Sequence, residues 1–302
     1  LKTLIQQLQT HRPLHLESPV EQPRRAAVCA IFRCRPTTLI QPTNNTIPTS
    51  IQEFLDQPWV NDSEPELLFI QRATRATDRW SGHVAFPGGK NEPGETDEQT
   101  AERETMEEIG LDLNSSAFLP VGTLDAREIS NMKGELLMVL VPYVYIQVVP
   151  DNLPLTIQES EVAAVQWVPL QFFLSKTPYP DTPLRKSFMI GNVSFPAIDL
   201  PTEDESRRMQ LWGLTLGMTR ELIELTETPG TMGRPAWQQF VTMAKAYPKF
   251  SYSDMNVLIR FFMYIQPPKR AIYVAIIWRI MVGGVIIGSL VPKLLRLKKK
   301  YI

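Results

Sequence analysis

Residues 89–111 carry more acidic side chains than a folded surface needs, and the spacing of these side chains restricts what the segment can form. In a helix Glu104, Glu107 and Glu108 occupy an arc of about 100°, and like charges so placed repel one another. Such a cluster is expected where a divalent cation lies among the carboxylates, since Mg²⁺ prefers oxygen ligands. Between Asn91 and Glu108 there are eight carboxylates against one base, Arg103; they are Glu92, Glu95, Asp97, Glu98, Glu102, Glu104, Glu107 and Glu108.

The residues around this acidic cluster define the ends of the helix. Thr96 with Gln99 three positions later is the pattern of a capping box, and Gly110 is a typical C-terminal stop. We therefore expect a helix over residues 97–109. Its core-facing side chains are expected to be Ala101, Thr105 and Ile109.

Strand patterns surround this helix, and helical patterns follow them. With 302 residues, 43% of them hydrophobic, the chain can form one or two domains. A nearly continuous apolar run at 136–149 predicts a strand buried on both faces, with a bulge or break at Pro142. Strands are expected at 26–33, 66–72, 84–86, 117–124, 136–148 and 163–168, and helices at 211–225, 235–246 and 253–265. Strands around one crossing helix, closed by further helices, predict the α+β class and an α/β/α sandwich.

The C-terminal segment has a different character from the rest of the chain. Residues 271–291 contain one charge, Arg279, and as a helix would extend about 31 Å, close to the bilayer core of about 30 Å. An arginine near the centre of a helix raises the free energy of membrane insertion by about 2.5–3.5 kcal/mol. The eleven Ile, Val and Leu residues together lower it by roughly 3–7 kcal/mol. A buried helix of the soluble domain is the alternative, which the lack of a polar stripe disfavours.

We therefore predict a single transmembrane helix, with basic residues on both flanks. It would be a C-terminal anchor with the preceding domain in the cytosol, similar to tail anchors of the mitochondrial outer membrane or the peroxisome. The small residues Gly284 and Gly288 could pair two such helices into a homodimer, and the alternative, which a single such pair favours, is that their spacing arose by chance. The net charge of −1 argues against a nucleic-acid partner.

The acidic segment resembles the Nudix box, Gly-x5-Glu-x7-Arg-Glu-U-x-Glu-Glu-x-Gly-U, where U is aliphatic. Thr105 stands at the first aliphatic position, and an exposed acidic helix without chemistry is the alternative. The fixed positions are matched by Gly89, Glu95, Arg103, Glu104, Glu107, Glu108 and Gly110.

The resemblance implies a metal-dependent hydrolase that uses Mg²⁺ or Mn²⁺. It implies that Arg103 pairs with Glu95 to hold the loop against the helix, with Gly110 structural. The catalytic residues would be Arg103, Glu107 and Glu108, and the metal ligands would be Glu104, Glu107, Glu108 and the carbonyl of Gly89. The general base stays open between Glu107 and glutamates outside the box, which are Glu128, Glu159 and Glu161.

Several basic residues precede the box, and the guanidinium groups of the arginines among them could bind phosphate oxygens with two hydrogen bonds each. Pairing of these arginines with the acidic helix is the alternative. Trp80 and His83 could stack on a base, although each is equally consistent with a structural role. The expected substrate-binding residues are Arg72, Arg75, Arg79 and Gly88.

These upstream residues resemble the coenzyme A diphosphatase branch of the family. Arg72-Ala73 and Gly82-x3-Phe86-Pro87-Gly88-Gly89 fit its signature, and Arg79 falls two residues late. Segments 161–170 and 211–215 are also similar to this branch. The resemblance covers residues 26–225, which we expect to be a Nudix hydrolase domain. Residue patterns outside it predict an N-terminal extension (1–25), a helical extension (226–268) and the anchor with its basic tail (269–302).

The expected reaction is hydrolysis of the diphosphate in a nucleoside diphosphate derivative. Coenzyme A or an acyl-coenzyme A is the first expectation, giving adenosine 3′,5′-bisphosphate and an (acyl-)4′-phosphopantetheine. Hydrolysis of ADP-ribose or a dinucleotide is the alternative within enzymes. A membrane-tethered module that binds a nucleotide without turnover is the alternative from another class.

Overall fold

The chain forms two compact units. The first contains residues 1–180 and 196–246, and the second contains 181–195 and 247–302. The computed structural model describes residues 1–21, 23–37, 46–75, 80–130, 135–175, 181–187, 191–204, 206–227, 249–250, 257–259, 261, 274–278 and 280–281.

A mixed sheet forms the centre of the first unit. In its main path β3-β2-β1-β7-β5, β1 and β7 pair in parallel, while β4 joins β1, β6 joins β7 and β8 joins β2. The sheet is therefore organised around two long, adjacent strands. The strands are β1 (Arg25–Pro36), β2 (Ser63–Arg72), β3 (Val84–Ala85), β4 (Gly88–Lys90), β5 (Phe118–Thr123), β6 (Arg127–Ser130), β7 (Leu136–Gln147) and β8 (Val162–Pro169).

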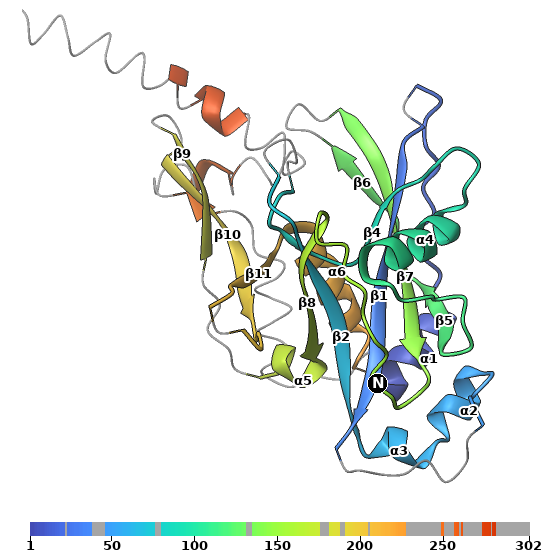
Figure 1. The fold of residues 1–302 in the computed structure, drawn as a ribbon. Helices are drawn as coiled ribbons and strands as arrows, with labels where there is room; N and C mark the ends of the chain where they lie inside the picture. Colours follow the sequence, from blue (N-terminus) through green and yellow to red (C-terminus); the bar gives the residue numbers. More distant parts are fainter. Residues whose placement is uncertain are drawn as a thin grey trace, which may run out of the picture. The chain divides into compact units, whose positions relative to one another are not determined.

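Helices cover both faces of this sheet (Figure 1). Successive side chains of β1 alternate between the faces: Ala27 belongs to the core beneath α4 (Asp97–Ile109), and Ala26 belongs to the core shared with α1 (Lys2–Thr10) and α6 (Gly213–Glu224). This arrangement confirms the predicted α/β/α sandwich. The remaining helices of this unit are short: α2 (Ile51–Leu55), α3 (Pro58–Asn61) and α5 (Leu170–Phe173).

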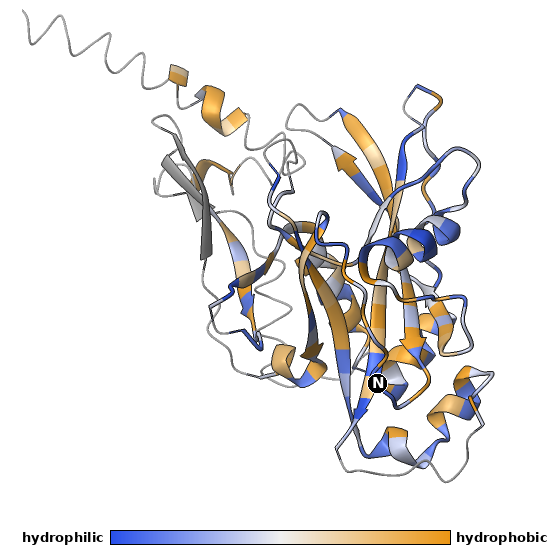
Figure 2. Cartoon of the chain, viewed as in Figure 1, coloured by the Kyte–Doolittle hydropathy of each residue, from blue (hydrophilic) through white to orange (hydrophobic). Residues whose placement is uncertain are grey.

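Helix α4 begins and ends where the sequence predicts. The capping box of Thr96 and Gln99 is formed, and Gly110 ends the helix in the left-handed conformation at φ 75°. A Cβ on Gly110 would lie 2.8 Å from the Cβ of Thr156, so the position needs glycine for space as well. Ala101, Thr105 and Ile109 are all buried, as predicted. The outer face of α4 is hydrophilic (Figure 2).

Three features of this unit differ from the pattern in the sequence. β7 is one continuous strand whose pairing with β1 shows no register shift at Pro142, so the predicted bulge or break at this residue is wrong. On the side of β7 away from β1, the pairing with β6 ends at Leu140 and the pairing with β5 begins at Tyr143. Pro142, which has no N–H, lies in the gap between these two partners. The predicted helix at 211–225 begins later, because β11 (Met209–Trp212) precedes α6. Helix α1, within the predicted N-terminal extension, buries Leu4, Ile5 and Leu8 in the main core.

The second unit contains β9 (Asp181–Ser187), one end of β10 (Gly191–Leu200) and β12 (Lys249–Phe250). β10 pairs with β9, and Val193 pairs with Phe250. The predicted helix at 235–246 lies outside the described residues, and 257–259 and 261 are helical within 253–265.

The predicted membrane span falls mostly outside the part of the chain that the structure describes. Within 271–291, residues 274–278 and 280–281 are described, and they are helical. Among the described residues, no helix combines the length and apolar character needed to cross a bilayer.

Candidate active site

A pocket of about 840 Å³ lies in the first unit, beside the loop that leads into α4. Its floor is the face of the sheet that carries Ala26 and Val28 of β1. The charged residues at its wall come from the end of β2 and the loop after it, from β4, from α4 and from the residue before β8. They are Arg72, Arg75, Lys90, Glu104, Glu108 and Glu161.

Glu108 is the most deeply buried of these charged groups. Its side chain lines the pocket although the residue is only 1% exposed. Burial raises the pKa of this carboxyl to about 8, opposed by the hydrogen bond that Gly88 donates at 2.9 Å and by the charge of Arg72. Arg72 Nη1 lies 3.7 Å from Glu108 Oε1. The negative charges of Glu104 and Glu161 raise the pKa further, so the site disfavours its own charged form.

Glu104 lies against the glycine turn. A Cβ added to Gly89 would be 2.4 Å from Glu104 Cδ, so only glycine leaves room for this carboxylate. At Gly88 a φ of 142° and the close approach of Ala27 O likewise require glycine. Burial raises the pKa of Glu104, which faces the same pocket as Glu108.

Arg103 connects the loop of the box to α4. Its Nε lies 2.6 Å from Glu95 Oε1 and its Nη2 lies 3.1 Å from Glu95 Oε2, so the ion pair implied by the resemblance is present in fork geometry. Its Nη2 also donates to Lys90 O at 3.2 Å. The hydrogen bond from Arg103 is the main reason that the pKa of Glu95 falls to about 2.

Glu107 lies apart from the other two box glutamates. Its side chain is 58% exposed, it pairs with Arg103 at 2.9 Å, and it does not line the pocket. Glu104 and Glu108 are therefore brought together in the pocket, and Glu107 is not. The three share one side of the helix, but the guanidinium of Arg103 lies between Glu107 and the pocket-facing Glu104, which it contacts at 3.2 Å.

The predicted phosphate-binding arginines lie in different surroundings. Arg72 lines the pocket beside Glu108. Arg75 also lines it, and its guanidinium contacts Glu161 Oε1 at 3.2 Å and Ser160 O at 2.7 Å. Arg79 lies outside the described residues. Pairing with the acidic helix is therefore seen for Arg72, whereas Arg75 pairs with the segment before β8.

One of the glutamates considered as general base reaches the pocket. Glu161 lines it, while Glu107, Glu128 and Glu159 do not. Sequence spacing could not separate these candidates, because Glu161 approaches the box only through the pairing of β8 with β2.

Trp212, which follows β10, was not predicted to belong to the site. Trp212 lines the pocket, and its ring centroid lies 4.6 Å from that of His83 in an edge-to-face arrangement. Trp80 lines the pocket as well. The contact joins residues that are far apart in the chain, so no local signal could have revealed it.

The pocket residues fit a hard divalent cation. Glu104 and Glu108 supply carboxylate oxygens, and the repulsion between them is the kind that a divalent cation relieves. Among the described residues, however, the three box glutamates do not form a group of three ligand atoms within 4.8 Å of one another.

Comparison with known proteins agrees with this geometry. Residues 58–188 match the family described as the NUDIX domain, a range that includes the box and α4. The chain contains a NUDIX domain.

Relatives of this NUDIX domain occur in several organisms. An uncharacterized protein of Schizosaccharomyces pombe is 39% identical over 159 residues, 51% of this chain and 44% of the relative. The mitochondrial coenzyme A diphosphatase NUDT8 of Homo sapiens is 52% identical over 48 residues, 16% of this chain and 20% of the relative. The peroxisomal coenzyme A diphosphatase ndx-8 of Caenorhabditis elegans is 30% identical over 135 residues, 44% of this chain and 54% of the relative.

These matches confirm the predicted resemblance to the Nudix family and to its coenzyme A diphosphatases. The chain spans about half or less of the length of each of these relatives.

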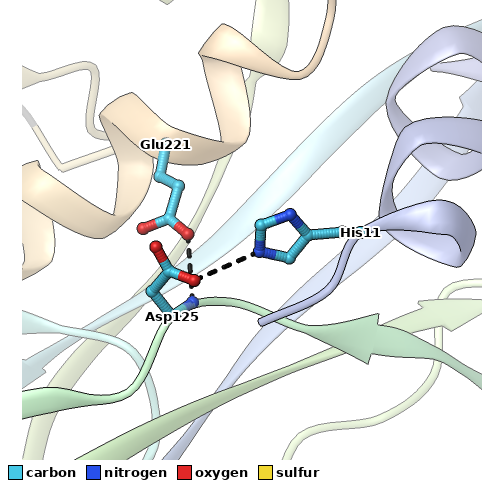
Figure 3. Close-up of side chains that lie close together, drawn as sticks. All are labelled: His11, Asp125 and Glu221. Atoms are coloured by element: carbon cyan, nitrogen blue, oxygen red, sulfur yellow. Dashed lines mark hydrogen bonds and ion pairs between the residues drawn. The ribbon is translucent and has the colours of Figure 1, made fainter. Parts of the chain in front are cut away.

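A second acidic group lies away from the box of the NUDIX domain (Figure 3). The ligand atoms of His11, Asp125 and Glu221 lie within 4.8 Å of one another, with His11 Nε2 3.4 Å from Asp125 Oδ1. Both carboxylates already have partners: Asp125 accepts from the N–H of Leu14 at 2.8 Å, and Glu221 pairs with Arg127. The group therefore joins the segment after α1 to α6 rather than offering an open site.

Proposed function

We propose that this chain hydrolyses the diphosphate bond of a nucleoside diphosphate derivative. The observation that carries the proposal is that Glu104 and Glu108 face one pocket together with the cations Arg72 and Lys90. Paired carboxylates with raised pKa values fit a divalent cation, and the cations fit phosphate oxygens.

We propose Mg²⁺ or Mn²⁺ as the cofactor, held by Glu104, Glu108 and the carbonyl of Gly89. The ion would neutralise the diphosphate and lower the pKa of the attacking water. Arg72 would bind a phosphate oxygen from one side, and Arg103 would keep the loop in place through Glu95. Glu161 would accept the proton as water adds to one phosphorus, the anhydride P–O bond breaks, and two phosphate monoesters leave.

Coenzyme A is the first substrate in this proposal. Two curated relatives bear the name coenzyme A diphosphatase, and the residues from Gly82 to Gly89 fit that branch. The products would be adenosine 3′,5′-bisphosphate and 4′-phosphopantetheine.

The test is turnover by the full chain of a panel that contains coenzyme A, ADP-ribose and a dinucleoside diphosphate, with Mg²⁺. Hydrolysis should fall by about 10²-fold or more in Glu108→Gln, because removing one group that stabilises the transition state has an effect of this size. Glu159→Gln is the matched control, since Glu159 is exposed and does not line the pocket. Turnover of ADP-ribose but not of coenzyme A would show that ADP-ribose is the substrate. Tight binding of coenzyme A without turnover would indicate that the chain is a binding module rather than an enzyme.

A further inference from the structure

A second ion pair, besides that of Arg103 with Glu95, fastens the loop of the box. Arg25, the first residue of β1, directs its guanidinium fork at Asp97: Nε donates to Oδ1 at 2.8 Å and Nη2 donates to Oδ2 at 2.6 Å. Asn91 Nδ2 also donates to Asp97 Oδ1, at 2.8 Å. The two ends of the loop between β4 and α4 are thus joined to each other and to β1.

The position of Asp97 on α4 relates this ion pair to the pocket. Asp97 is the first residue of α4 and lies seven positions before Glu104. Seven residues turn a helix by about 700°, close to two full turns, so both carboxylates lie on one side of α4 about 10.5 Å apart along its axis. At the second of these positions Glu104 lies against Gly89. A shift of α4 along its axis would therefore move Asp97 past Arg25 and Glu104 past Gly89 by the same amount.

The third nitrogen of Arg25 binds the segment that precedes β1. Its Nη1 donates to Leu16 O at 2.9 Å and to Ser18 Oγ at 3.2 Å. Every nitrogen of the guanidinium group therefore has a partner, which fixes the plane of the group. Leu16 in turn packs against two buried valines of β7. Residues 16–18, which precede the span 58–188 that matches the NUDIX domain, thus support the loop of the box.

We infer that Asp97 and Arg25 are positioning residues, whose ion pair sets the axial position of α4 and with it the distance between Glu104 and the carbonyl of Gly89. The inference rests on the proposed function, because these two groups are taken there as metal ligands. Mg²⁺ requires its oxygen ligands at about 2.0–2.1 Å in a nearly ideal octahedron. A small displacement of Glu104 along the helix axis would therefore weaken metal binding, although neither Asp97 nor Arg25 lines the pocket.

The experiment compares Asp97→Asn and Arg25→Lys with Arg33→Lys in the full chain. Arg33 and Glu66 form the matched control, because this pair also involves β1, is equally 2.6 Å long, is mostly buried and does not line the pocket. All three variants should lower the melting temperature. Only the first two should raise the dissociation constant for Mn²⁺, measured by calorimetry without substrate, by about tenfold or more. The Mg²⁺ concentration for half-maximal turnover should rise by the same factor, with the KM for coenzyme A little changed.

The metal titration keeps this inference separate from the proposed function. Weaker Mn²⁺ binding by Asp97→Asn would support the positioning role even if no diphosphate were hydrolysed, in which case the proposed function alone would fail. If Asp97→Asn and Arg33→Lys have the Mn²⁺ affinity and Mg²⁺ requirement of an active wild type, the positioning role is overturned. Absence of Mn²⁺ binding by the wild type would overturn both proposals. Should Asp97→Asn not fold, Arg25→Lys, which keeps the charge but not the fork, decides by the same criteria.

Discussion

The backbone N–H of Gly88 donates a hydrogen bond to the buried carboxylate of Glu108, 2.9 Å away. The turn before the box and the last turn of α4 are therefore joined at the atoms that face the pocket. This bond and the charge of Arg72 do not offset the burial of Glu108, so the pKa of the carboxyl rises from 4.5 to about 8.

The stability of the metal-free protein should consequently depend on pH through Glu108. Because the folded-state pKa is raised above the unfolded value, the favourable contribution of the protonated carboxyl is complete below about pH 4.5 and is lost as pH rises through about 8. The loss should be on the order of a few kcal/mol in the free energy of unfolding. Urea denaturation of wild type and Glu108→Gln in EDTA, from pH 5 to 9, measures it. The variant should lack this component, and identical pH profiles would contradict the assignment.

Gly89→Ala should abolish activity, because the new methyl group would displace the carboxylate of Glu104 from its position 2.4 Å away. The measurement is kcat/KM with saturating Mg²⁺, and we expect a loss of about 100-fold or more. Gly94→Ala is the control within the same loop. Its Cβ would meet nothing within 4 Å, but its φ of 91° is strained for alanine. This control should lower the melting temperature with little loss of activity.

Arg103→Lys should lower activity strongly, since one ammonium cannot reproduce the two hydrogen bonds to Glu95 or hold Lys90 O at the same time. We expect kcat to fall about 100-fold, because the loop would no longer position Gly89 against α4. The control is Arg35→Lys, which alters an ion pair with Glu64 of equal 2.6 Å length outside the pocket. Equal activity of both variants would show that the fork geometry of Arg103 has no role in catalysis.

Glu161→Gln tests the proposed base. The variant keeps the shape of the side chain but cannot accept a proton, so kcat should fall by about 10²- to 10⁴-fold with KM little changed. Glu159→Gln, two residues away and outside the pocket, should behave as wild type. If instead Glu107→Gln has the larger effect on kcat, the base lies in the box.

The membrane anchor stays a prediction from hydropathy. Deleting residues 266–302 should move the protein from the membrane fraction to the soluble fraction of lysed cells, because the apolar run at 271–291 is lost. A matched variant in which Ile276, Ile277 and Ile280 are replaced by aspartate should do the same. Identical fractionation of the full and shortened chains would exclude the anchor.

Features fixed by neighbouring residues were predictable from the sequence. The limits of α4 follow from Thr96, Gln99 and Gly110, and its buried side follows from helical spacing. The position of Glu107 was not predictable, because an arc on a helix does not tell which carboxylate a nearby guanidinium will bind.

Features that depend on contacts between residues far apart in the sequence could not be predicted either. Trp212 reaches the pocket because β11 precedes α6, and Glu161 reaches it because β8 pairs with β2. The burial of Leu4 and Leu8 depends on a sheet whose strands lie far along the chain.

The pairing of β1 with β2, β4 and β7 has a practical consequence. The span that matches the NUDIX domain begins at residue 58, after this strand has ended. A fragment expressed from that boundary would lack the strand that lies between β2 and β7. The unpaired backbone N–H and C=O groups of both strands would then be exposed and could pair with other chains, which promotes aggregation. The span that matches the NUDIX domain is thus shorter than the segment needed for folding, and a shortened protein should keep the N-terminal residues through β1.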